Sequence, residues 1–348
     1  MYFLITRTLA LFNVKRRRLF LGIATFIFTF PVFAVIDYLN RGIKFVEVCG
    51  IIGYIITAFL IYYVLSLLVI LLVRFIISLI RKQRHDVYDK FTVILSTVFS
   101  IVICLVGITL AQIPEIESYD FDIAGDHDLK VVVLSDIHYG STGSLLSLDR
   151  MVDNINKQEA DVVILAGDVF DNYIGNLSHD EFASAMNRIE SKLGVYAITG
   201  NHEFKLNSLE QIIYFYEGTQ VKLLLDEEVV IDNIRLVGRI DYKHGRKELS
   251  EVVSDSNLPL VVLDHQPQYF RDAEGVNAIL QISGHTHNGQ IFPGDIIVYF
   301  YNLILFNSPS NGISNFDDFT LAITRGYGTW GFPMRLSGAS QILIYNFK

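Results

Sequence analysis

The chain has 348 residues and a formal net charge of −9, and this charge is unevenly divided. Residues 1–113 hold 12 Lys and Arg against 4 Asp and Glu, a balance of +8, whereas residues 114–348 hold 16 against 33, a balance of −17. Nucleic-acid affinity depends mainly on Lys and Arg that neutralise phosphates, so a part this acidic is excluded as a polyanion-binding module. Both cysteines, Cys49 and Cys104, belong to the first part, so the second part has neither a thiol nor a disulfide.

Three stretches of the first part are typical of membrane spans. Residues 19–36, 48–73 and 91–111 contain no charged side chain, and their lengths of 18, 26 and 21 residues are those of transmembrane helices. Pro31 lies in the first stretch, where a membrane helix can tolerate it. Residues 2–13 are apolar but too short to cross, which favours an interfacial helix. A cleaved signal peptide is a weaker interpretation of residues 19–36, because two further spans follow.

Basic residues flank these spans in an alternating pattern. Four, at positions 15–18, directly precede the first span, two lie between the first and second, and five lie between the second and third. The positive-inside rule then predicts a cytoplasmic N-terminus. Because three spans are an odd number, the sequence predicts a multi-pass membrane domain over residues 1–113. It also predicts one large domain over residues 114–348 on the extracytoplasmic side of the cell membrane.

Five short polar segments of the second part each follow an apolar, largely β-branched run. They are Asp136-Ile-His138, Gly167-Asp168, Gly200-Asn201-His202, His265 and Gly284-His285-Thr-His287. Such runs predict buried strands of an α/β sheet, and ligand sites in these sheets lie beyond the carboxyl ends of the strands. The spacings of 32 residues from Asp136 to Asp168 and 33 from Asp168 to Asn201 suit a strand, a crossover helix and the next strand. We therefore expect the five segments to converge at one edge.

The residue types in these segments suit a site for two divalent or trivalent metal ions. Two ions about 3.5–4 Å apart need a carboxylate that bridges them and further oxygen or nitrogen ligands. Asp168 is the candidate bridge. The other protein ligands would be Asp136, His138 and His287 for one ion, and Asn201, His265 and His285 for the second. No thiolate takes part, which favours manganese, iron or zinc in a hydrolytic site over a structural zinc site.

From about Lys130 to the C-terminus the sequence resembles the calcineurin-like metallophosphoesterase family, because all five family motifs are present in family order. The stretches 284–290 and 324–328 are most similar to the membrane-associated bacterial branch of this family. The resemblance implies a four-layer αββα sandwich, an α/β fold in which two mixed sheets lie face to face with helices outside. It also implies the ligand partition above, with His202 near the leaving group and Asp171 orienting that imidazole. A helix or turn cap is the other interpretation of Asp171.

Two positions depart from the family pattern. Asn288 stands where the membrane-associated branch more often has Gly. Asn172 stands where the protein phosphatases of the family carry Arg, so a phosphoprotein phosphatase is the less fitting member.

Beyond the fifth motif the pattern predicts strands over residues 296–305, 319–324 and 341–345. The segment 324–335 carries the only Trp, two Arg and three Gly of this region, which is typical of a loop that presents charged and aromatic groups to a substrate. Arg325 and Arg335 are therefore candidate substrate-binding residues, and a packed turn is the alternative. Residues 113–128 are predicted to form a polar, acidic connector between the two domains.

Together these features predict a membrane-anchored, extracytoplasmic hydrolase of a phosphate mono- or diester, with a lipid-linked ester among the options. The expected partners are the lipid bilayer and the phosphate-ester substrate, which is amphiphilic in the lipid-linked case. Neither nucleic acid nor an obligate protein partner is expected. One alternative is a non-catalytic surface sensor or scaffold stabilised by metal. Another is a hydrolase of nucleotide-linked lipid pyrophosphates at the inner face. His202, which is not needed as a ligand, favours catalysis over the scaffold.

Overall fold

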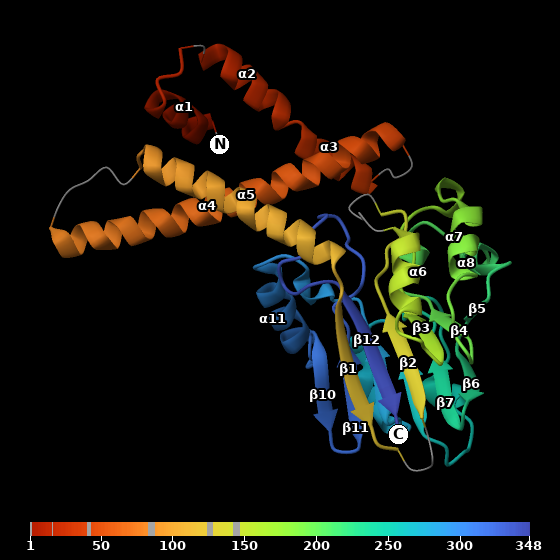
Figure 1. The fold of residues 1–348 in the computed structure, drawn as a ribbon. Coiled ribbons are helices and arrows are strands. Elements are labelled where there is room, and N and C mark those ends of the chain that lie inside the picture. The colour runs from red at the N-terminus through yellow and green to blue at the C-terminus, as the bar shows by residue number, and fades with distance from the viewer. Residues whose placement is uncertain (1, 16, 40–42, 83–87, 124–127, 142–146) are drawn as a thin grey trace. The chain divides into compact units, whose positions relative to one another are not determined.

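The computed structural model describes residues 2–15, 17–39, 43–82, 88–123, 128–141 and 147–348 (Figure 1). The chain forms two compact units. A helical unit consists of residues 1–109 with the short segment 331–333. An α/β unit consists of residues 110–330 with 334–348.

The helical unit is built from α1 (Tyr2–Leu11), α2 (Arg17–Ile27), α3 (Phe30–Leu39), α4 (Lys44–Arg81) and α5 (Lys90–Gln112). Two segments, Phe45–Arg81 and Lys90–Gln112, are long and apolar enough by length and composition to cross a membrane. With 38 residues, α4 extends about 57 Å, roughly twice the hydrocarbon thickness of a bilayer. Its apolar stretch 48–73 therefore continues as helix to Arg81. The Arg74 Nη1 atom donates to Asp89 Oδ1 and to Thr92 Oγ1, both at 2.6 Å, and so ties α4 to the start of α5.

Residues 19–36, the first predicted span, are divided between α2 and α3 by a turn at Phe28 and Thr29. Pro31 has no N–H to continue the helical ladder of α2, and the Thr29 hydroxyl donates to the Phe26 carbonyl at 2.6 Å. The helix consequently restarts at Phe30. Gly53 allows α4 to approach this restart closely, since a Cβ there would lie 2.2 Å from the Phe30 carbonyl oxygen. Whether residues 19–36 cross the bilayer stays a prediction.

Two six-stranded sheets form the centre of the α/β unit. The first has the order β1-β12-β2-β3-β4-β5, with bounds Glu115–Phe121, Gln341–Phe347, Leu129–Leu134, Val162–Ala166, Val195–Ile198 and Val221–Leu223. The second has the order β10-β11-β9-β8-β7-β6, with bounds Gly312–Phe316, Phe319–Ile323, Leu280–Ser283, Leu260–Leu263, Ile234–Gly238 and Glu227–Ile231. The helices are α6 (Leu148–Asn156), α7 (His179–Met186), α8 (Leu209–Tyr216), α9 (Leu249–Val252), α10 (Phe270–Gly275) and α11 (Gly294–Phe306). Short 3-10 turns are η1 (Ile174–Asn176), η2 (Glu203–Lys205), η3 (Pro267–Tyr269) and η4 (His287–Gly289).

Alternation along the strands divides the apolar core into layers. In β2, Val133 packs between the two sheets with residues of the facing sheet such as Val261 and Ile282. Its neighbour Val132 points the other way, into a second cluster that contains residues of α6, α7 and α8. A third cluster packs residues of β8 and β11 against α9 and α10. The unit is therefore a four-layer αββα sandwich, which confirms the fold that the family resemblance implied.

Two sequence-based expectations are corrected. Residues 296–305, expected as a strand, lie in helix α11. The prediction was wrong because a run of β-branched, aromatic and leucine side chains, interrupted only by Asn302, has no periodicity that separates a strand from a helix. Residues 113–128, expected as a connector, instead contain β1, which pairs with β12 in parallel. Only Ile113 and Pro114 remain between α5 and β1. The strands expected at 319–324 and 341–345 are confirmed as β11 and β12.

Candidate metal centre

All five predicted segments begin at the carboxyl ends of parallel strands. Those strands are β2, β3 and β4 of the first sheet and β8 and β9 of the second. Backbone pairing continues past the strand ends, since the N–H groups of Asp136 and His138 donate to the carbonyls of Gly167 and Asp168 at 3.0 and 2.9 Å. This pairing holds the first two segments side by side.

The backbone at these segments is under strain. Five predicted ligands have a positive φ, namely Asp136 at 54°, His138 at 53°, Asp168 at 51°, His285 at 73° and His287 at 50°. Non-glycine residues seldom adopt this left-handed region, and they do so mostly where the surrounding structure compels it at functional sites.

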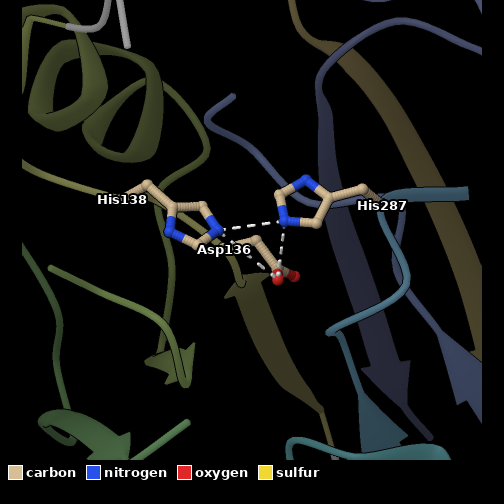
Figure 2. Close-up of side chains that lie close together, drawn as sticks. All are labelled: Asp136, His138 and His287. Atoms are coloured by element: carbon tan, nitrogen blue, oxygen red, sulfur yellow. Dashed lines mark hydrogen bonds and ion pairs between the residues drawn. The ribbon is translucent and has the colours of Figure 1, made fainter. Parts of the chain in front are cut away.

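The first group of possible ligands consists of Asp136, His138 and His287 (Figure 2). The Nε2 atoms of the two imidazoles lie 2.9 Å apart, and His287 Nε2 lies 3.3 Å from Asp136 Oδ1. Two unprotonated ring nitrogens would repel each other at this distance. A cation between them, or a proton on one of them, removes that repulsion.

Asp168 belongs to both of the other groups, one with His138 and His202 and one with His265 and His285. Its Oδ2 lies 3.0 Å from His265 Nε2 and 4.0 Å from the Nε2 atoms of His138 and His202. Its Oδ1 accepts the His202 backbone N–H at 2.7 Å. A carboxylate shared in this way has the position that a bridging ligand requires.

Two further observations fit a metal centre. The buried Oδ1 atom of Asn201 has no hydrogen-bond partner among the residues that the structure describes, and buried polar atoms seldom lack one. The His265 ring is oriented by a hydrogen bond from Nδ1 to the Ala166 carbonyl at 2.8 Å, which turns Nε2 toward the cluster. Such outer contacts are usual for imidazoles that bind metal ions. The donor set of carboxylates, imidazoles and one amide oxygen thus fits two borderline metal ions.

Burial sets the protonation states of the imidazoles. It lowers the pKa of His285 to about 4, helped by the charge of His265, and it lowers the pKa of His287 well below the ordinary value. Both rings are therefore neutral at neutral pH, which is the form that binds a metal ion. The pKa of Asp168 is lowered well below its usual range because, against the effect of burial, His265 and His202 stabilise the carboxylate.

His202 and Asp171 form a pair beside the second group. The Nδ1 atom of His202 lies 2.8 Å from Asp171 Oδ1, and Asp171 Oδ2 lies 3.5 Å from His138 Nδ1. Asp171 is buried, and the two helices that follow it, η1 and α7, have Tyr173 and Ser178 at their N-cap positions. Its contacts are those of a residue that orients two imidazoles.

Sequence reasoning missed Glu203. This carboxylate is buried, and it accepts backbone N–H groups from Asp168, Val169 and Phe170 of one segment and from Gly200 of another. Burial and the nearby charge of Asp168 raise its pKa to about 8. Glu203 thereby ties the turn after β3 to the turn after β4. Its only sequence signal was its position directly after His202.

Lys205 was also missed, and it lies at the same pair. Its Nζ atom is 3.0 Å from His202 Nε2 and 4.9 Å from the ring centroid of Trp330. The Trp330 ring meets the His202 ring edge to face at 5.4 Å between centroids. An exposed ammonium and an indole therefore flank the imidazole that was predicted to act on the leaving group.

The surroundings of Arg325 and Arg335 differ from the expected substrate-facing position. The Nη2 atom of Arg325 donates to Glu115 and to Glu117 of β1, both at 2.7 Å. Arg335 is fully buried and donates to the carbonyls of Arg325 and Gly328, at 2.7 and 3.1 Å. Its Nη2 lies 3.4 Å from His287 Nδ1, so Arg335 supports the loop behind the first ligand group. Two carboxylates of β1 thus bind the Arg325 guanidinium, and carbonyls of a glycine-rich turn bind that of Arg335, which a sequence pattern does not reveal.

Comparison with known proteins gives a consistent picture. Residues 129–289 match the family model described as calcineurin-like phosphoesterase. An uncharacterized metallophosphoesterase of Helicobacter pylori is 30% identical over 226 residues, which cover 62% of this chain and 59% of that protein. One of Campylobacter jejuni is 29% identical over 294 residues, 79% of this chain and 75% of the relative. A transmembrane protein with metallophosphoesterase domain from Bos taurus is 29% identical over 295 residues, 76% of this chain and 63% of the relative.

The close packing at Gly284 generates a prediction. A Cβ at this position would lie 2.0 Å from Ser135 Oγ and 2.4 Å from Asp136 Oδ2, so Gly284→Ala must displace Asp136 without removing any ligand. We expect metal affinity to fall roughly 10–100-fold, the usual effect of disturbing the support of a ligand. The matched control is Gly275→Ala, because a Cβ there meets nothing within 4 Å. Metal titration of both purified variants checks this, and equal affinities would contradict the assignment of Asp136.

Proposed function

Because this chain belongs to the calcineurin-like metallophosphoesterases, which are metal-dependent phosphoric ester hydrolases, we propose that it hydrolyses a phosphate mono- or diester carried by a membrane amphiphile. In this proposal at least two helices cross the membrane, and they hold the catalytic unit at the bilayer surface. The phosphoesterase activity follows from the family and the clustered ligands. The amphiphilic substrate is the finer inference, and it depends on strand register.

The strand register supports a substrate drawn from the bilayer. Helix α5 ends at Gln112 and β1 begins at Glu115, so two residues, about 7 Å of extended chain, separate them. Glu115 pairs with Gln341 in β12. Because β12 runs antiparallel to β2 with Leu343 opposite Val133, Gln341 lies at the level of Ser135, directly before Asp136. The chain thus enters the α/β unit at the edge that carries the proposed ligands.

We propose that Asp168 would be a ligand shared by two metal ions, for which manganese is the first candidate and iron or zinc are the other metals that the ligands suit. Asp136, His138 and His287 would complete the protein ligands of one ion, and Asn201, His265 and His285 those of the other. When bound, such ions neutralise phosphoryl oxygens and lower the pKa of water.

The remaining steps belong to the side chains. Asp171 accepts the hydrogen bond from His202 Nδ1, which leaves Nε2 to donate a proton to the departing oxygen of the ester. Lys205, 3.0 Å from that nitrogen, adds positive charge where the leaving group becomes negative. The Asp168 carboxylate fixes the His202 backbone, so the proton donor and the phosphate-binding groups keep one geometry.

We further propose that the catalytic unit lies on the extracytoplasmic side. The basic residues before residue 19 and those between residues 74 and 90 support a cytoplasmic location for both segments. Residues 19–36 then cross the bilayer as α2 and α3, with the turn at Phe28–Thr29 inside the membrane. The interruption of a membrane helix beside a proline is tolerated where neighbouring helices cover it.

The role of His202 can be separated from metal binding. His202→Ala is expected to keep both metal ions and to lose roughly 10²–10⁴ in turnover of a phosphoester, the usual contribution of a positioned proton donor. His179→Ala is the control, because that ring lies outside the cluster and hydrogen bonds to the Glu217 carbonyl. Metal analysis and turnover are measured on the same samples. Wild-type turnover in the fully metallated His202 variant would favour the non-catalytic scaffold.

The membrane orientation is tested with reporters. A reporter that is active only in the cytoplasm is fused after Lys348, and the same reporter is inserted after Arg81 at the end of α4. Three crossings predict a silent reporter at Lys348 and an active one at Arg81, because the basic residues retain that loop inside. Activity at Lys348 would instead place the enzyme at the inner face and revive the nucleotide-lipid alternative.

A further inference from the structure

Helix α11 (Gly294–Phe306) exposes an unusual amount of apolar surface for a helix of the α/β unit. Its exposed side chains are Ile296, Ile297, Tyr299, Phe300, Tyr301, Leu303, Ile304 and Leu305, and Phe292 just before the helix is exposed as well. Ile304 reaches 73% exposure and Ile297 reaches 67%. Contiguous apolar patches of this kind are rare on soluble monomers and mark surfaces that bind a partner or a membrane.

The pattern around the helix narrows the choice of partner. Asp295 is the only charged residue of α11, and among its residues only Asn302 is buried. A surface helix normally has one apolar stripe and one polar face, whereas a helix that is apolar on all sides is surrounded by protein or lipid. A groove on a partner protein covers one face of a helix. The hydrocarbon region of a bilayer can cover every face that the α/β unit leaves exposed.

The base of α11 is tied to the end of a membrane-length helix within the α/β unit. The Leu336 N–H donates to the Gln290 carbonyl at 2.8 Å, four residues before α11 begins. Four residues along the same segment, the Ser340 N–H donates to the Leu110 carbonyl at 3.1 Å and its hydroxyl to the Ala111 carbonyl at 2.9 Å. Residues 336–340 therefore join the start of α11 to the last turn of α5.

We propose that α11 is a monotopic membrane helix that enters one leaflet of the bilayer and seats the catalytic unit on the lipid surface. The inference rests on the proposed membrane anchorage and adds a second attachment to it. Thirteen residues extend about 20 Å, too short to span a bilayer, so the helix enters a single leaflet. Phe292, Tyr299 and Tyr301 are the aromatic residues preferred at the headgroup level. The unit's balance of −17 opposes attraction to anionic lipids, so burial of apolar side chains drives this attachment.

The attachment has a consequence for the metal centre. The segment η4, which begins at His287, packs directly on the start of α11, because the carbonyl carbon of Gly294 would lie 2.1 Å from a Cβ on Gly289. The Thr286 hydroxyl donates to the Ser310 carbonyl just after the helix, at 2.6 Å. The residues at both ends of α11 are thus fixed to the segment 286–289, which contains the proposed ligand His287. Seating α11 at the interface brings the ligands to the level of lipid phosphates.

The test measures the depth of α11 directly in the full chain. A Cys49→Ala, Cys104→Ala background carries either Ile304→Cys or, as the matched control, Val230→Cys on β6, which is 58% exposed and apolar but remote in sequence from the helix. Each cysteine is labelled with an environment-sensitive fluorophore, and the protein is placed in phosphatidylcholine nanodiscs. We expect a blue-shifted emission quenched by nitroxide lipids at position 304, and at position 230 quenching by aqueous iodide only. Adding Ile297→Glu to the position 304 chain should reverse its lipid quenching.

Three results would overturn the inference. Iodide quenching at both positions would show that α11 faces water. A disulfide between two copies at position 304, with no quenching by nitroxide lipids, would show that a second chain covers the helix. Equal quenching by nitroxide lipids at both positions would show that α11 is not a distinct site of membrane attachment. Turnover of a small chromogenic phosphoester is recorded in parallel, so that loss of the proposed activity is distinguished from loss of membrane seating.

Discussion

Two carboxylates, Asp136 and Asp168, lie buried beside one another among imidazoles, and the free-energy cost of that burial shapes the α/β unit. Both are almost completely inaccessible, and both approach His265 Nε2, at 3.9 and 3.0 Å. An ionised carboxylate removed from water costs several kcal/mol unless positive charge and hydrogen bonds compensate it. Two cations would supply that charge, and the turns with positive φ hold the ligands in place to receive them. The buried charges of this site therefore fit a role in binding metal ions better than a purely structural role.

The same constraint bears on two further buried side chains, Glu203 and Arg335. Glu203 is a third buried carboxyl group, and it accepts four backbone N–H groups while burial and the charge of Asp168 raise its pKa to about 8. Arg335 is buried behind His287, where its donors occupy the carbonyls of a tight loop. Together they fix the loops from which the ligands project. Substituting either residue should disturb the ligands without altering their chemistry.

Much of the α/β unit could be predicted from the sequence. The apolar runs before Asp136, Asp168 and His265 specify buried strands, and strand ends converge in any parallel sheet, so the residues that come together were identifiable in advance. Helix α11 could not be predicted. The run from Ile296 to Leu305 lacks the polar residues, repeated about every 3.6 positions, that distinguish a helix exposed to water from a buried strand. We propose that lipid surrounds this helix, and the periodicity of a sequence does not show which medium surrounds a helix. Glu203 was missed because its partners are backbone groups, which leave no mark on the sequence.

We propose that seven side chains hold two metal ions for phosphoester hydrolysis. The decisive experiment is elemental analysis of the purified full chain, combined with turnover of a chromogenic phosphoester before and after chelation. We predict two transition-metal ions per chain, loss of turnover when both are removed, and recovery on adding back manganese. A chain that binds no metal, or one that keeps its turnover after both ions are removed, would contradict the claim.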